Sequence, residues 1–317
     1  MLRETFQVRK NVLGRVVTEI GHYAGLIELK GDTLLALHTD GVGTKTIVAS
    51  NLRRYDTVGI DCVAMNVNDL ICLGAEPIAM LDYLAIDKPQ ERVIEDIMQG
   101  LVVGARQAGI AIVGGETAVM PELINGFDLA AMSIGVVKKK RVVTGERIQV
   151  GDVIYGMASS GIHSNGLTLA RRVLLSRYEL SQRVPELNRT IGEELLEPTR
   201  IYVRPVLRML KRCEVHGLAH ITGGAFSKFR RLGHKLGFQI DEIPEPHAIF
   251  KLIQRLGKIT NREMYRTFNM GVGFCVIAPR SEEQEIVKAA EREGCECHEV
   301  GKVTGKEGVT VKGVRAD

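Results

Sequence analysis

The sequence predicts two globular domains that combine helices and strands, an α/β or α+β architecture. The chain has 317 residues, 45% of them hydrophobic and 25% charged, which is more than one hydrophobic core usually supports. Strand-like apolar runs alternate with amphipathic, helix-like stretches. This pattern breaks between residues 144 and 152 and then restarts with a strand, so we predict domains at residues 1–145 and 146–317.

The apolar periodicity predicts the elements in chain order. In the first domain we expect strands at 34–37, 78–86, 110–113 and 127–137, of which 110–113 is buried, and a helix at 56–73. A further helix follows Asp87, its expected cap, with Pro89 in the first turn. In the second domain we expect a strand at 153–158, helices at 167–175, 199–212 and 225–232, and a strand and loop at 219–224. Residues 186–196 are polar and predict a surface excursion.

Bulk properties argue against several classes of protein. No run of about 18 apolar residues could span a bilayer, and the first residues lack a signal-peptide core, so we expect a cytoplasmic protein with no membrane partner. The six cysteines are scattered, as is typical of reduced, buried thiols. The net charge is only +4 and tryptophan is absent. The stacking surfaces of a nucleic-acid binder are therefore scarce, and no nucleic-acid partner is expected.

Three short stretches of the first domain place acids beside glycine or amide residues, at 39–45, 66–69 and 114–117. Mg²⁺ is usually held by one or two carboxylates plus substrate phosphates, and glycine lets backbone N–H groups approach phosphate oxygens. We therefore expect Asp40, Asp69 and Glu116 to share one or two Mg²⁺ ions at an ATP site. A simple tight turn would also explain the glycines at 41 and 43. The segment is no Walker A loop, because Thr44 stands directly before Lys45.

The predicted helix at 56–73 has one polar face, formed by Asp61, Asn66, Asn68 and Asp69. A water-facing surface is the ordinary explanation. However, residues 56–74 contain no Lys, Arg or Glu, and Asp and Asn are poorer helix formers than these residues. We therefore predict that the short oxygen-bearing side chains are aimed at a ligand.

Two turns of the second domain contain glycine and lead into predicted helices, at residues 159–166 and 220–224. Helix N-termini present free N–H groups that bind phosphate, so the pair predicts a phosphorylated ligand. The alternative is that Ser164 or Asn165 is an ordinary N-cap. His163 is the better candidate for a reactive imidazole, whereas His220 is equally compatible with a structural role.

These segments resemble the phosphoribosylformylglycinamidine cyclo-ligase family, also called aminoimidazole ribonucleotide synthetases, of de novo purine synthesis. The resemblance runs from about residue 31 to 311 and is carried by residues 38–45, 55–77, 81–83, 114–121, 159–166, 198–203, 219–224 and 264–273. It implies an α+β fold of two domains, in which the first domain pairs with its copy in a homodimer and their strands form a shared barrel. It also implies ATP-dependent ring closure of formylglycinamidine ribonucleotide to aminoimidazole ribonucleotide, ADP and phosphate.

The resemblance also implies roles for individual residues. ATP and Mg²⁺ would lie on the first domain and the nucleotide substrate toward the second, with Asp40, Asp69 and Glu116 as metal ligands. The implied catalytic residues are His163, Lys45 and Asp69. The implied ATP contacts are Asp40, Gly41, Gly43, Thr44, Lys45, Asn68, Asp69, Gly115, Glu116 and Thr117. The implied substrate contacts are Ser160, His163, Ser164, Asn165, Thr222, Gly223 and Gly224.

Two alternatives stay open from the sequence. One is another ATP-dependent enzyme of the same superfamily, such as a thiamine-phosphate kinase, a selenophosphate synthetase or a hydrogenase-maturation protein. The chain end lacks the terminal cysteine of the last, no N-terminal cysteine supports the second, and Glu116 in place of aspartate argues against the first. The other alternative is a non-catalytic nucleotide sensor, because residues 20–26 contain fewer glycines than the family usually carries there.

Overall fold

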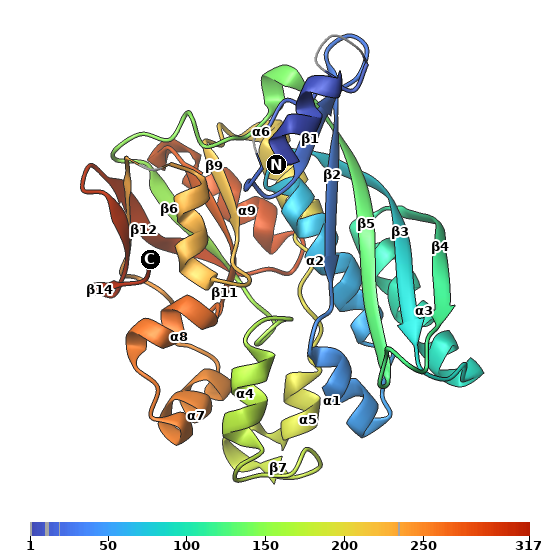
Figure 1. Ribbon diagram of the computed structural model, residues 1–317. Coiled ribbons are helices and arrows are strands. Elements are labelled where there is room, and N and C mark those ends of the chain that lie inside the picture. Colours follow the sequence, from blue (N-terminus) through green and yellow to red (C-terminus); the bar gives the residue numbers. More distant parts are fainter. Residues whose placement is uncertain (1, 10–12, 19, 234) are drawn as a thin grey trace.

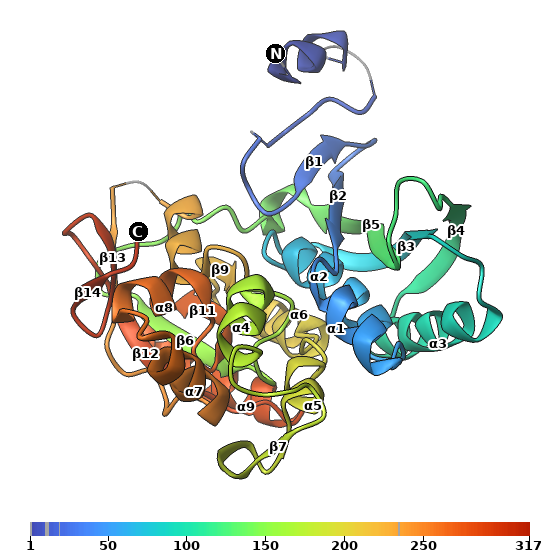
Figure 2. The same cartoon turned by 60° about the horizontal axis from the view of Figure 1, so that its bottom comes forward.

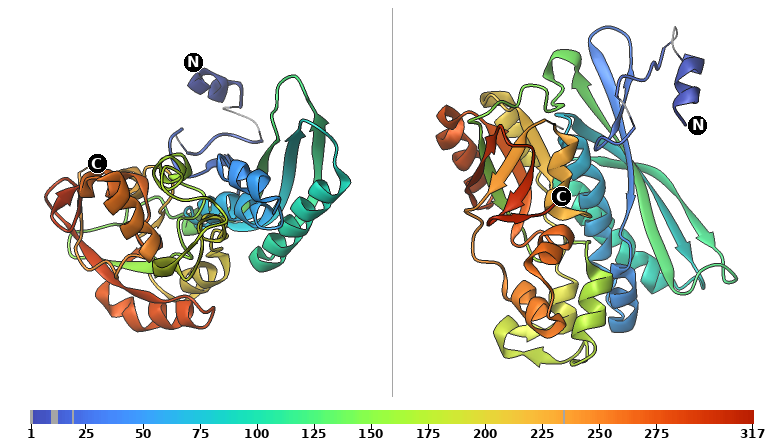
Figure 3. Two further views of the ribbon diagram at one scale, coloured as in Figure 1. Left: turned by 90° about the horizontal axis from the view of Figure 1, so that it is seen from below. Right: turned by 60° about the vertical axis from the view of Figure 1, so that its left-hand side comes forward.

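The computed structural model describes residues 2–9, 13–18, 20–233 and 235–317. Its strands form two larger sheets, one from each half of the chain, and helices pack against both in an α+β arrangement (Figure 1). The two halves lie side by side, and helix α2 (Val58–Ile71) runs between the two sheets (Figures 1 and 3). The junction between the halves is therefore built around α2.

The first sheet has the strand order β1-β2-β5-β3-β4. All neighbouring pairs are antiparallel except β3 and β4, which are parallel. Helices α1, α2 and α3 lie together on one side of this sheet (Figure 2). Its elements are β1 (Gly25–Glu28), β2 (Thr33–Gly41), α1 (Lys45–Leu52), α2, β3 (Glu76–Ile86), α3 (Glu91–Ala108), β4 (Ala111–Val119) and β5 (Phe127–Lys138), with the 3₁₀ helix η1 (Leu2–Arg9) before them.

Strand β4 is the outer edge of this sheet, which corrects the expectation of a short, buried strand at 110–113. It continues to Val119 and includes the Gly-Gly-Glu-Thr stretch, which the sequence predicts to lie beyond the end of the strand. Because β4 has a sheet neighbour on one side only, it is largely exposed, and Val113 retains 63% of its accessible surface. An exposed apolar edge strand is a ready surface for pairing with another chain.

Helix α2 is buried along its whole length apart from Ile60. Most of its apolar residues belong to the main hydrophobic core, and Leu70 belongs to a smaller cluster. Its contact with α3 is close because glycines stand at the crossing. A Cβ added at Gly100 would lie 2.2 Å from the carbonyl oxygen of Asp56, and one added at Gly59 would lie 2.2 Å from the amide nitrogen of Leu101. Residues without a side chain are therefore required on both helices.

The second sheet has the strand order β14-β13-β10-β12-β6-β11-β9 and is antiparallel except for the pair β10 and β13. Strands β6 and β11 lie at its buried centre. The strands of the second half are β6 (Val153–Ala158), β7 (Arg183–Val184), β8 (Arg189–Thr190), β9 (Gly217–His220), β10 (Gly237–Ile240), β11 (Val272–Ala278), β12 (Cys297–Thr304), β13 (Gly308–Val311) and β14 (Val314–Arg315). The α-helices are α4 (Leu167–Leu174), α5 (Ile191–Leu195), α6 (Val203–Arg212), α7 (Ala248–Gly257), α8 (Asn261–Thr267) and α9 (Glu283–Glu291). The 3₁₀ helices are η2 (Lys139–Arg141), η3 (Pro185–Leu187), η4 (Ala225–Arg231) and η5 (Arg280–Glu282).

Most predicted elements are confirmed, although several ends differ. Helix α3 begins at Glu91 after Gln90, with no side-chain cap, so Asp87 does not cap it. The helix expected at 199–212 begins only at Val203, because residues 197–202 run along α2 and bond to its polar face. The segment expected as a polar surface excursion contains the short helix α5, whose Ile191 and Leu195 are buried.

Two bulk expectations can be compared with the structure. All six cysteines are free thiols, five of them buried, as expected from their scattered positions. Among the described residues, no helix has both the length and the apolar character needed to cross a bilayer.

Candidate active site

A cavity of about 570 Å³ opens where strands β1 and β2 and the end of α2 face the 3₁₀ helix η4 of the second half. Two of the predicted metal ligands, Asp40 and Asp69, line this cavity together with Lys228 and Arg231. We call it the acidic cavity. Carboxylates from one half of the chain thus face cationic side chains from the other half across a space large enough for a small ligand.

Asp69 is held in place by two imidazoles. It lies near the end of α2 and is only 3% exposed. Its Oδ1 accepts a hydrogen bond from Nδ1 of His220 at 2.7 Å, and its Oδ2 lies 3.6 Å from Nε2 of His38. Burial alone would raise the pKa of Asp69, but the charge of Lys228 and the hydrogen bond from His220 outweigh it and lower the pKa to about 2. Asp69 is therefore a fixed, ionised carboxylate at neutral pH.

Asp40 stands at the end of β2, as the sequence predicted for an acid between a strand and a turn. Its Oδ1 accepts the backbone N–H of Gly41 at 2.8 Å. Burial raises the pKa of Asp40 above its ordinary value, the Gly41 bond opposes this, and the nearby charge of Asp69 raises the pKa further. Two carboxylates that repel each other in one cavity are a suitable environment for a bound cation.

His220 acts on Asp69 as an orienting group. It is fully buried, and burial lowers its pKa although the bond to Asp69 acts in the opposite direction. Its Nδ1 faces Asp69, while its Nε2 lies 3.4 Å from the amide nitrogen of Asn68. A neutral ring with its proton on Nδ1 satisfies both contacts, because it donates to the carboxylate and accepts from the amide. This supports the positional role that the sequence left open for His220.

Lys45, for which the sequence predicts an ATP-contacting, catalytic role, does not line the acidic cavity. Its side chain is fully buried, and its Nζ lies 2.9 and 2.8 Å from the two carboxylate oxygens of Asp61. Nζ also donates to the carbonyl oxygen of Glu197 at 2.5 Å. The ammonium group is thus enclosed at the junction between the halves and paired there with Asp61.

The polar face of α2 explains this arrangement, because it packs on the second half rather than on a ligand. Asp61 also accepts hydrogen bonds from the backbone and the hydroxyl of Thr199, at 2.8 and 2.6 Å, and from Ser164 at 3.0 Å. Asn68, a predicted ATP contact, donates to the carbonyl of Arg200 and accepts from the backbone of Tyr202, both at 2.9 Å. Asp69, at the end of this face, instead lines the acidic cavity.

His163, for which the sequence predicts a proton-transferring role, is fully buried. It has φ of +61° in the turn after β6, and its Nε2 accepts the backbone N–H of Ser160 at 3.2 Å. Burial lowers the pKa of His163 well below its ordinary value. The ring is therefore neutral and stabilises the turn.

Glu116 is not brought to Asp40 and Asp69 within one chain. In the register of the first sheet, Asp40 pairs with Ala131, Ala131 with Asp82, and Asp82 with Gly115. Three strand spacings therefore separate β2 from β4, about 14 Å. Among the described residues, no group of three His, Cys, Asp or Glu side chains is arranged to hold a metal ion. The predicted trio of acids does not meet in one chain, and Gly115 and Thr117 share the distant position of Glu116 on β4.

The predicted glycine turns lie along the same junction as the acidic cavity. Gly43 has φ of +67° with open space around it, and the hydroxyl of Thr44 lies 3.3 Å from that of Thr168 on α4. The exposed Gly223 and Gly224 begin η4, and Gly223 adjoins the side chain of Asn165. The other predicted substrate contacts are less accessible: Thr222 is buried, Ser160 donates to the carbonyl of Pro198, and Ser164 is bonded to Asp61.

Lys228, Arg231 and His38 are the cavity residues that sequence reasoning missed as site residues. Lys228 and Arg231 extend from η4 over the ring of Tyr23, at 5.4 and 5.1 Å from its centroid. The sequence pattern that could have identified the two cationic residues is their spacing of three residues, shortly after the double glycine at 223–224. His38 stands two residues before Asp40, so its side chain lies on the same face of β2.

Comparisons with known proteins agree with this architecture. The family descriptions "AIR synthase related protein, N-terminal domain" and "C-terminal domain" match residues 21–137 and 149–314. The chain is 53% identical over 312 residues to the phosphoribosylformylglycinamidine cyclo-ligase of Thermococcus kodakarensis, covering 98% of this chain and 91% of the relative. It is 52% identical over 290 residues to the cyclo-ligase of Methanocaldococcus jannaschii, covering 90% of this chain and 82% of the relative.

Solved structures share the fold at lower identity. A thiamine-monophosphate kinase from Stenotrophomonas maltophilia superposes with a TM-score of 0.69 at 20% identity, covering 99% of this chain and 95% of that one. The hydrogenase maturation protein HypE of E. coli superposes with a TM-score of 0.63 at 18% identity, covering 89% and 84%. Both family domains match in order, and the cyclo-ligase relatives are about 50% identical across nearly the whole chain. The chain therefore belongs to the AIR synthase related family, among the phosphoribosylformylglycinamidine cyclo-ligases.

Proposed function

We propose that this chain catalyses the ATP-dependent ring closure of formylglycinamidine ribonucleotide to aminoimidazole ribonucleotide, ADP and phosphate, a step of purine biosynthesis. The observation that carries the proposal is the identity of about 50% to cyclo-ligases along nearly the whole chain. ATP and a phosphorylated substrate both favour a cytoplasmic setting, which we propose as well.

In the proposed reaction, the formyl oxygen of the substrate attacks the γ-phosphorus of ATP and ADP leaves. The amidine nitrogen then forms a bond to the formyl carbon, a proton leaves that nitrogen, and the C–O bond to phosphate breaks as the ring closes. Phosphorylation turns a poor leaving oxygen into a good leaving group. The protein's contribution to such a transfer is mainly positioning and charge neutralisation.

The acidic cavity is the proposed site of the ATP phosphates. Asp40 and Asp69 fit a Mg²⁺ site, because the metal commonly takes one or two carboxylates and completes its shell with phosphate oxygens and water. Bound there, Mg²⁺ would neutralise phosphate charge. Lys228 and Arg231 line the opposite wall and would attract the phosphates directly, while His220 keeps Asp69 oriented.

Residues from both halves of the chain line the acidic cavity, so neither proposed domain would hold the ligands alone. We assign ATP binding and dimerisation mainly to residues 1–145 and the substrate mainly to residues 146–317. The exposed turn at Gly223 and Gly224, beside Asn165, supports the second assignment, because it adjoins the cavity through η4.

We also propose a homodimer with a barrel shared between the two first sheets. The exposed edge β4 supports it, since Val113 and Val119 are 63% and 48% exposed there. Because Glu116 lies about 14 Å from Asp40 within one chain, it would complete the site of the partner subunit rather than its own.

Mixing two inactive variants tests this assignment. Asp69→Asn and Glu116→Gln homodimers should each be inactive, but a mixed dimer would contain one site with both native residues. Random exchange of subunits should then restore about a quarter of wild-type activity. If Glu116 acted within its own chain, no mixed dimer would contain an intact site and no activity would return.

The reaction itself is tested by ADP release from purified protein with ATP and Mg²⁺. We expect release to depend on formylglycinamidine ribonucleotide and to yield aminoimidazole ribonucleotide. A rate indifferent to that substrate would refute the cyclo-ligase proposal. Release driven by thiamine monophosphate would favour the kinase alternative, and tight ATP binding with no turnover would favour the sensor.

A further inference from the structure

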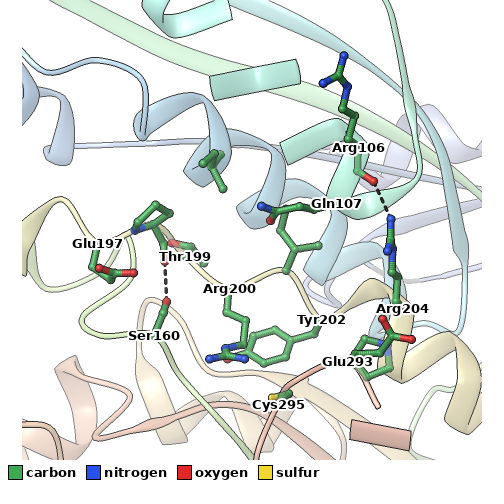
Figure 4. A pocket seen from close by; sticks show the side chains of 14 residues that line it. Arg106, Gln107, Ser160, Glu197, Thr199, Arg200, Tyr202, Arg204, Glu293 and Cys295 are labelled. Carbon is green, nitrogen blue, oxygen red and sulfur yellow. Dashed lines mark hydrogen bonds between the residues drawn. The ribbon is translucent and has the colours of Figure 1, made fainter. Parts of the chain in front are cut away.

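A second cavity, of about 550 Å³, lies on another part of the junction between the halves. It is bounded by the end of α3, residues 197–202, the start of α6 and the residues that follow α9 (Figure 4). None of its lining residues lines the acidic cavity. We call it the arginine cavity, because Arg106, Arg200 and Arg204 all line it.

The charges of this cavity are unbalanced. Its two carboxylates are already engaged elsewhere: Glu197 accepts from Arg189 at 2.6 Å, and Glu293 accepts from Arg208 at 2.8 Å. Within the described part of the chain, no carboxylate lies within 4.0 Å of the guanidinium of Arg106, Arg200 or Arg204. The cavity therefore has an excess of positive charge without an internal counter-ion.

Two of these guanidiniums keep free donors. Arg200 donates one N–H to the carbonyl of Gly294 at 3.0 Å, and its Nε is buried without a partner. Arg204 donates one N–H to the carbonyl of Arg106 at 3.0 Å. Each guanidinium carries five N–H groups. Figure 4 shows these two guanidiniums at separate points of the cavity wall, Arg204 beside the carbonyl of Arg106 and Arg200 beside Tyr202, while the guanidinium of Arg106 points away from both.

We propose that the arginine cavity binds a phosphate-bearing metabolite that reaches both Arg200 and Arg204, with its phosphate at one guanidinium and its other oxygen atoms at the second. Guanidinium groups match phosphate in charge and in the geometry of paired hydrogen bonds. The volume suits a ligand of sugar-phosphate or mononucleotide size. Gln107 and Ser160 supply neutral polar groups on the same wall.

Binding there would also act on the junction. The segment that contains Arg200 bonds to α1 through Glu197 and Lys45. It bonds to α2 through Thr199 and Asp61, and through the backbone of Arg200 and the side chain of Asn68. Asn68 directly precedes Asp69 of the acidic cavity. A ligand that restrains Arg200 would therefore stabilise the seated arrangement of the two halves, and by linkage it would alter ATP affinity.

Calorimetric titration of the full chain with ribose 5-phosphate, without ATP or Mg²⁺, tests the proposal. We expect saturable binding that Arg204→Gln and Arg200→Gln each weaken by at least about tenfold. Arg262→Gln is the matched control, because Arg262 is an exposed arginine of α8 far along the chain from the cavity. Lys228→Gln tests whether the signal comes from the acidic cavity instead. Both should bind as the wild type does.

Several results would overturn the proposal. They are no binding to the wild type at millimolar ligand, unchanged binding to Arg204→Gln, or loss of binding in Lys228→Gln. Arg204 is exposed and makes one hydrogen bond, so its variant should fold even if Arg200→Gln does not. Because the titration needs no turnover, its failure is separate from failure of the proposed reaction.

A kinetic arm distinguishes two sources of the phosphate. If ribose 5-phosphate raises the KM for formylglycinamidine ribonucleotide, the cavity takes the phosphate of the substrate itself. If it changes kcat or the KM for ATP alone, the natural ligand is a separate effector.

Discussion

Replacing Lys45 with methionine should destabilise the protein severely. The Lys45 and Asp61 side chains are both fully buried, and their closest contact is 2.8 Å. The variant leaves the Asp61 carboxylate in the interior with only the neutral donors of Thr199 and Ser164. Breaking a buried ion pair by removing one partner typically costs about 3–5 kcal/mol. We expect a loss of that size in the free energy of unfolding.

Equilibrium unfolding in urea measures this loss. The matched control is Lys251→Met, which removes the lysine of an exposed pair with Glu245, whose side chains are 55% and 79% exposed. Such surface pairs contribute about 1 kcal/mol or less. If Lys45 were a phosphate-binding residue, as the sequence suggested, Lys45→Met would lose ADP release and keep its stability. A loss below about 1 kcal/mol would therefore refute the structural assignment.

Four further predictions concern the acidic cavity and the core. Asp69→Asn should reduce ADP release by at least about a hundredfold, because it removes a fixed carboxylate from the phosphate site. The pKa of Asp69 is lowered to about 2 in the folded state. Its ionisation therefore stabilises the fold at pH values above its ordinary pKa, and this stabilisation is lost as the pH falls toward 2. The unfolding free energies of wild type and Asp69→Asn should accordingly converge by about 2 kcal/mol between pH 5 and 2, and a constant gap would contradict this. Gly100→Ala should cost about 1–3 kcal/mol in thermal unfolding because its Cβ would overlap the carbonyl of Asp56, whereas Gly305→Ala, with only one neighbouring atom at 3.8 Å, should be nearly neutral. Chelation with EDTA should abolish substrate-dependent ADP release and added Mg²⁺ should restore it; release that persists in EDTA would exclude the proposed metal.

The elements of the fold could be predicted from apolar periodicity, because each strand or helix shows its buried face in its own sequence. The strand at 127–137 and the helix at 56–73 correspond closely to β5 and α2. The helix start at Val203 could not be predicted, since residues 199–202 stay outside the helix where Asp61 and Asn68 bind them from the other half. That contact depends on how the halves meet, which local pattern does not encode.

The candidate site was predicted only in part for the same reason. Asp40 and Asp69 share a cavity because β2 and the end of α2 are neighbours within one sheet-and-helix layer. Lys45 and His163 carry the right chemistry for a site, but their burial is set by the opposite half of the chain. The distance of Glu116 from Asp40 depends on the strand order of the first sheet, which places β5 and β3 between the two residues.

The polar face of α2 also limits how the two halves can move. A shift of residues 197–202 by a single position would strip Asp61 and Asn68 of their partners at the same moment, leaving several buried donors and acceptors unmatched. Gradual sliding of the two halves past each other would therefore cost too much free energy. We expect the halves to be either fully seated or fully parted, so that any opening during turnover is an all-or-nothing event.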